Sequence, residues 1–106
     1  MKVFISMPMK GKSAEQVKAD MDKAIHDVKE LYMYRLKGSN DTLEIIDSVC
    51  KEYDPNKGRG QFVRFSTKLL ADADLLYVCR GWERAPGCVF EVQAATNFDL
   101  DIIFEK

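Results

Sequence analysis

One glutamate lies at a place in the sequence where a carboxylate could do chemistry. Pro86 and Gly87 predict the start of a helix, because proline fits the first helical turn, where its missing N–H costs nothing. Glu91 then falls about one turn inside that helix. The same helix face, read on the helical period, also carries Gly87, Ala94, Ala95 and Phe98. Since these residues are small or apolar, we expect the face to look toward a sheet, where a glutamate is costly to bury without a partner or a task.

The chemistry open to Glu91 is that of an ionised, poorly solvated carboxylate. The positive end of the helix dipole favours the charged form. Such a carboxylate could attack a sugar carbon or stabilise an oxocarbenium ion. Spacing alone favours a plainer alternative, in which Glu91 caps the helix or forms an ion pair near its end.

Two loops carry further candidates. Ser6 and the loop Met7-Pro8-Met9 could hold a substrate through backbone amides, although this loop is no phosphate-loop fingerprint. Trp82 could stack on a base, or it could simply pack against the protein. Glu83 could serve the same site or lie exposed.

Three charged residues have roles that the sequence leaves open. Asp74 stands at the entry to an apolar run and could orient the neighbouring loop or cap the preceding helix. Arg80 and Arg84 could reach a phosphate as charged donors. The single histidine, His26, falls off the apolar stripe of its helix, so we expect it at the surface.

Strand and helix signals alternate along the chain and indicate an α/β fold. Strands are predicted at 2–6, 43–49, 75–79 and 100–104, and helices at 14–32, 62–70 and 88–97. A capping box at 13–16 marks the first helix start, with the serine hydroxyl and the glutamine amide both satisfying free backbone donors. This alternation implies parallel strands joined by right-handed crossovers, with helices on both faces. Ligands of such sheets bind beyond the carboxyl ends of the strands, so the loops 6–12 and 80–87 are where we expect the site.

The chain length, composition and net charge are those of an ordinary globular protein. The 106 residues fit a single domain spanning 1–106, and a net charge of −1 suggests no nucleic-acid polymer and no membrane surface as a partner. No apolar run approaches the roughly 20 residues of a membrane span, and the N-terminus lacks the apolar stretch of a signal peptide, so we expect a cytoplasmic protein. The cysteines lack metal-ligand spacing, so we expect no metal and small buried thiols at Cys50, Cys79 and Cys88.

Several segments resemble proteins of the nucleoside 2-deoxyribosyltransferase-like superfamily. They are Lys2 to Met9, Ala71 to Val78, the Gly81-Trp82-Glu83 loop, the Gly87 to Glu91 helix start, and Ala94-Ala95. The Gly-Trp-Glu loop before a Gly-Cys-x-x-Glu helix is more specific, and it resembles the short DUF4406 branch of bacterial and phage proteins. The resemblance covers nearly the whole chain.

The resemblance implies a flavodoxin-like or Rossmann-like three-layer sandwich, with about four parallel strands in the order 2-1-3-4. It implies that Glu91 attacks the anomeric carbon of a nucleoside or nucleoside 5′-monophosphate, which releases the base and passes the sugar to another base or to water. No cofactor is required, and a homodimer or larger homo-oligomer is implied. The substrate-binding residues expected on these grounds are Ser6, Met7, Pro8, Met9, Asp74, Gly81, Trp82, Glu83 and Gly87.

Two positions depart from the family pattern. Ala85 stands where the transferases carry an aspartate and the phosphate-dependent hydrolases a serine, and Ser66 stands near the place of a second transferase aspartate. These departures count against base exchange. They leave two hypotheses, an enzyme that cleaves or exchanges the N-glycosidic bond through Glu91, and a non-catalytic nucleotide-binding module. A phospho-acceptor receiver domain would need paired acids after the first strand, and Ser6-Met7-Pro8 offers none.

Overall fold

Strands and helices alternate in the computed structural model, which describes residues 1–9, 11–35, 43–46 and 60–105. The elements, in chain order, are β1 (Lys2–Ser6), α1 (Ala14–Arg35), β2 (Glu44–Ile45), α2 (Gly60–Ala71), β3 (Leu75–Val78), the 3-10 helix η2 (Trp82–Arg84), α3 (Pro86–Asn97) and β4 (Asp101–Phe104). Of the predicted strand 43–49, residues 47–49 lie outside the described residues, as does Cys50. In the described residues we find no helix with the length and apolar character that a bilayer crossing demands.

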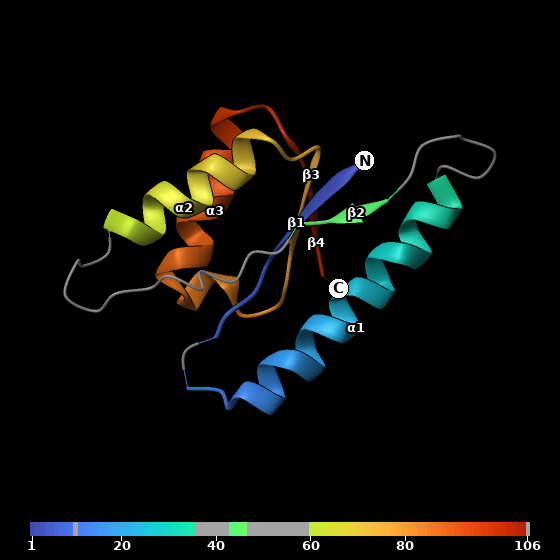
Figure 1. Cartoon of the computed structure of the whole chain (residues 1–106), viewed down its shortest axis with the longest axis horizontal. Helices are drawn as coiled ribbons and strands as arrows, with labels where there is room; N and C mark the ends of the chain where they lie inside the picture. Colours follow the sequence, from blue (N-terminus) through green and yellow to red (C-terminus); the bar gives the residue numbers. More distant parts are fainter. Residues whose placement is uncertain (10, 36–42, 47–59, 106) are drawn as a thin grey trace.

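The four strands form one parallel sheet in the order β2-β1-β3-β4. Helix α1 covers one face of this sheet, and α2 and α3 cover the other (Figure 1). This is the predicted flavodoxin-like three-layer arrangement. The strand order reverses between β1 and β3, where Ser6 pairs with Val78 at the carboxyl ends of the two strands.

Strand alternation divides the core into two clusters. In β1, Val3 and Ile5 pack with Ala24 and Val28 of α1, whereas Phe4 packs on the other face with Leu70 of α2 and Ala95 of α3. Successive side chains of β3 alternate in the same way, in the order Leu75, Leu76, Tyr77 and Val78. Because both faces are covered, every residue of β3 is buried, which explains its unbroken apolar run.

Two local predictions were wrong in detail. The Ser13 hydroxyl accepts a hydrogen bond from the Gln16 N–H at 3.1 Å, as predicted, but the Gln16 amide donates to Asp20 at 2.8 Å instead of closing a capping box. A capping box would need the Gln16 carbonyl oxygen to accept from the Ser13 N–H, whereas the bond from the Gln16 NH2 group to the Asp20 carboxylate, one turn ahead, directs the side chain away from the helix start. Phe98 was expected on the sheet-facing side of α3, but it follows the end of the helix and is 42% exposed.

Candidate active site

Glu91 lies on the buried face of α3, as the sequence pattern predicts. That face comprises Cys88, Glu91 and Ala95, which follow the helical period and are the buried residues of the helix. The Glu91 side chain is only 5% exposed. Helix α3 therefore carries a carboxylate into the interior beside the carboxyl end of β1.

Two buried hydroxyls bind the Glu91 carboxylate. Ser6 Oγ donates to Oε1 at 2.8 Å, and Ser66 Oγ donates to Oε2 at 3.1 Å. Strand alternation directs Ser6 to the face that α2 and α3 cover, two residues after Phe4. Ser66 comes from the buried face of α2, four residues before Leu70. The two serines thus approach the carboxylate from different elements and bind different oxygens.

Burial dominates the protonation of this carboxyl group. It raises the pKa of Glu91 from its ordinary value of 4.5 to about 7, although the hydrogen bonds from Ser6 and Ser66 lower it. Loss of solvation outweighs the two hydrogen bonds that favour the charge. The contribution of the helix dipole, which favours the ionised form, stays a prediction. None of the ion pairs formed in the described part of the chain involves Glu91. Within the described residues, Glu91 therefore neither caps the start of α3 nor belongs to an ion pair, so the plainer alternative does not hold there.

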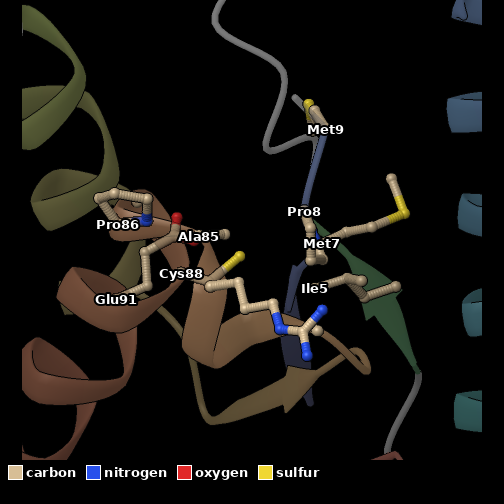
Figure 2. A pocket seen from close by; sticks show the side chains of 11 residues that line it. Ile5, Met7, Pro8, Met9, Ala85, Pro86, Cys88 and Glu91 are labelled. Atoms are coloured by element: carbon tan, nitrogen blue, oxygen red, sulfur yellow. The ribbon is translucent and has the colours of Figure 1, made fainter. Parts of the chain in front are cut away.

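Glu91 lines a pocket of about 380 Å³ between the loop after β1 and the start of α3. One side is formed by Ile5, Met7, Pro8 and Met9, and the other by Gly81, Arg84, Ala85, Pro86, Gly87 and Cys88. Figure 2 shows the methionines and Pro8 across from the first turns of α3. The described residues of the walls are thus mostly apolar, with one guanidinium and one carboxylate among them. The pocket lies at the carboxyl ends of the strands, as the fold class predicts.

Gly81 shapes the pocket through its backbone. Its φ of 88° is in the left-handed region, which residues with a Cβ rarely adopt. The position of a Cβ at Gly81 would lie 3.6 Å from Pro8 Cγ. The turn after β3 therefore packs directly against the loop after β1, and glycine permits its conformation.

Helix α3 begins without a side-chain cap, which leaves polar backbone at the pocket. Its N-cap residue is Ala85, whose side chain makes no capping hydrogen bond, and Pro86 follows at the first position. Gly87 and Cys88, which come next, line the pocket. Free N–H groups at a helix start attract anions, so this end of the pocket suits a negatively charged group.

Three of the predicted site residues do not reach the pocket. Trp82 and Glu83 line a separate hollow, where the Trp82 ring lies 5.4 Å from the ring of Phe104. Asp74 lies at the amino ends of the strands, where its carboxylate accepts a hydrogen bond from the Lys2 N–H at 2.7 Å. The residue types suggested chemistry, but η2 and the start of β3 direct these side chains elsewhere. Met7, Pro8, Met9, Gly81 and Gly87, by contrast, line the pocket, and Ser6 lies behind it on Glu91.

Ser66 and Cys88 are site residues that reasoning from the sequence missed. Ser66 interrupts the apolar stripe of α2, and a hydroxyl on such a stripe must find a partner when it is buried. Cys88 precedes Glu91 by three residues, so it shares the buried face. Burial raises the pKa of the Cys88 thiol, and the neighbouring Glu91 carboxylate raises it further. Cys88 therefore contributes a neutral wall to the pocket, in line with the prediction of a small buried residue.

Comparison with known proteins supports the fold assignment. No family model matches the chain, and no curated protein matches it. The structure is similar to that of a Clostridium botulinum CMP N-glycosidase, BcmB, with a TM-score of 0.55 and 18% sequence identity over 98% of this chain and 67% of that one. A likeness at this identity is a likeness of fold.

Proposed function

We propose that this chain cleaves the N-glycosidic bond of a nucleoside 5′-monophosphate, as a short member of the nucleoside 2-deoxyribosyltransferase-like superfamily. The observation that carries the proposal is the buried Glu91 carboxylate, which two hydroxyls hold at the edge of a mostly apolar pocket. The shared fold with a CMP N-glycosidase supports the same class of reaction.

The reaction proceeds by nucleophilic substitution at the anomeric carbon. An oxygen of ionised Glu91 attacks this carbon as the bond to the base nitrogen breaks, and the bonding electrons leave with the base, which takes a proton from solvent. Water then attacks the glycosyl ester, regenerates the carboxylate and releases the sugar phosphate and a proton. The pKa of about 7 leaves much of the carboxylate ionised at neutral pH and makes it a stronger base than an exposed glutamate.

The substrate phosphate binds at the start of α3 and near Arg84. Arg84 lines the pocket, whereas the Arg80 side chain lines the hollow beside Trp82. A guanidinium and the N–H groups of the first turn are complementary to a phosphate. Arg84→Gln is therefore expected to raise KM for monophosphates about tenfold or more while leaving KM for the matching nucleosides unchanged, and Arg80→Gln is the matched control. An equal effect of the two variants would argue against a phosphate at Arg84.

The proposal is tested by the release of free base. The protein is incubated with ribo- and deoxynucleosides and their 5′-monophosphates, and the free base is quantified by chromatography. Base release is expected from at least one monophosphate, with a loss of about a thousandfold or more in Glu91→Gln. Glu83→Gln removes the same charge from an exposed side chain and should retain activity. Activity that survives in Glu91→Gln would refute the proposed role of Glu91.

One observation favours the second candidate, a nucleotide-binding module without turnover. Glu91 is the single carboxylate among the described residues that line the pocket, and Ala85 lines it at the position where the transferases carry an acid. Glycosidases commonly use a pair of carboxyl groups. Nucleotide binding measured by calorimetry, without base release from any substrate, would establish the module. Adding a free acceptor base to the same assay tests for exchange, which would appear as a new nucleoside or nucleotide.

A further inference from the structure

Helix α2 contributes to the candidate site through one side chain. No described residue of α2 lines the pocket, yet Ser66 reaches the Glu91 carboxylate from behind, with Oγ 3.1 Å from Oε2. Ser66 is 1% exposed, so its hydroxyl has no access to bulk water. It would therefore meet Glu91 and not a substrate.

We propose that Ser66 is a positioning residue, which together with Ser6 fixes the Glu91 carboxylate in the orientation that faces the pocket. This inference rests on the proposed function for its catalytic meaning. The torsion that rotates a glutamate carboxylate has broad minima, so packing alone sets its plane poorly. Hydrogen bonds from two elements to two different oxygens remove that freedom, because rotation would break both of them.

The arrangement leaves the carboxylate able to react. An ionised carboxylate accepts at about four lone-pair sites, and the two serines occupy one site on each oxygen. Each oxygen therefore keeps a site that a sugar carbon can approach. The serines hold the group without blocking it.

The same hydroxyls support the charged form that attack requires. Both hydrogen bonds lower the pKa of Glu91, whereas burial raises it. A hydroxyl that donates to a buried carboxylate stabilises the anion. When the hydroxyl is removed, less remains to counteract the effect of burial, so the pKa of the carboxyl group rises further. Without Ser66, less of Glu91 would be ionised at neutral pH.

The test compares Ser66→Ala with Thr67→Ala, which makes a change to alanine at the next position of the same helix. In Ser66→Ala the midpoint of the pH profile of kcat should move upward by about one pH unit, because a hydrogen bond to a charged group is worth about 1.5 kcal/mol or more. The rate should fall about tenfold on the acid side of the profile, with KM unchanged. Part of the loss should remain in alkali, where Glu91 is ionised but lacks one of the two hydrogen bonds that orient it. Thr67→Ala should leave the midpoint where it is. A rate and a midpoint that both equal those of the wild type would overturn the proposal.

A second measurement needs no substrate. The protonation of Glu91 is followed by infrared difference spectroscopy, and its carboxyl band is identified by its loss in Glu91→Gln. The midpoint of this titration should rise in Ser66→Ala, and an unchanged midpoint would overturn the positioning role even if base release is observed. If no nucleotide releases base, the proposed function fails, and this titration still decides the role of Ser66. Should Ser66→Ala not fold, Ser66→Cys replaces the hydroxyl by a weaker donor and should shift the midpoint in the same direction.

Discussion

Replacing Glu91 by glutamine tests the buried carboxylate through the stability of the protein, independently of any activity. Folding raises the pKa of this group from 4.5 to about 7, so the folded state binds more protons than the unfolded state between these values. The group therefore favours the folded state fully at low pH, and this advantage is lost as the pH rises through about 7. Glutamine is always neutral and can both accept and donate hydrogen bonds with the two serines.

The magnitude follows from the size of the shift. Each pKa unit corresponds to about 1.4 kcal/mol of free energy. Because the pKa of Glu91 is raised, the free energy of unfolding of the wild type should fall by about 3 kcal/mol relative to that of Glu91→Gln between about pH 4 and about pH 8. The two proteins should have similar free energies of unfolding at the acid end. At the alkaline end the variant should be the more stable of the two, an instance of stability given up for a functional group.

The assay is urea unfolding of both proteins at a series of pH values, followed by circular dichroism. Comparing the two proteins cancels the titration of all other groups. Glu83→Gln is the matched control, because it removes an exposed charge and should differ from wild type by less than about 0.5 kcal/mol throughout. A constant difference between Glu91→Gln and wild type across the series would refute the reasoning that burial controls this carboxyl group.

Three further substitutions separate structural residues from the pocket. Asp74→Ala removes the acceptor of the Lys2 N–H and should lower the free energy of unfolding by about 1 kcal/mol in urea titrations. Base release should not change, because Asp74 lies at the amino ends of the strands and the pocket lies at their carboxyl ends. Gly81→Ala must hold alanine at a φ of 88° and should cost about 1 kcal/mol, measured in the same way; an unchanged stability would mean that the turn can relax. Trp82→Ala loses the ring contact with Phe104 and should cost roughly 2 kcal/mol while keeping KM within about twofold, and a large rise in KM would show that the indole does meet the substrate.

Local patterns in the sequence determined most of the fold. The alternation of apolar runs with periodic stripes predicted a parallel sheet with helices on both faces, because strands covered on both faces must be continuously apolar and crossovers are right-handed. The order of the strands, which the structure confirms, came from the family resemblance and not from this alternation. The same reasoning placed Glu91 on the buried face of α3. These features depend on residues a few positions apart, and side-chain periodicity records such relations directly.

The partners of Glu91 were decided by the tertiary structure. Ser6 and Ser66 are 85 and 25 positions away from it, and the serines meet the carboxylate because β1 and α2 both pack against α3. The position of Ser66 on an apolar stripe indicates a buried hydroxyl that needs a hydrogen-bond partner, but it does not indicate which residue that partner is. The direction of the pKa shift likewise depended on how completely the surrounding layers exclude water, which no single helix reveals.

The side chains of Trp82 and Asp74 show the same division. Both residue types suggested a site, and both lie beside predicted strand ends, but Asp74 precedes β3 and Trp82 follows it on η2. The predicted parallel strands already placed Asp74 at the amino ends, away from the pocket. The tertiary structure was needed to show that η2 directs the Trp82 ring toward Phe104. Sequence therefore determined which elements form and which faces they bury. The packing of β1, α2 and α3 decided which of the candidate groups share one pocket, because contacts between residues far apart in the chain produce no periodic pattern in the sequence.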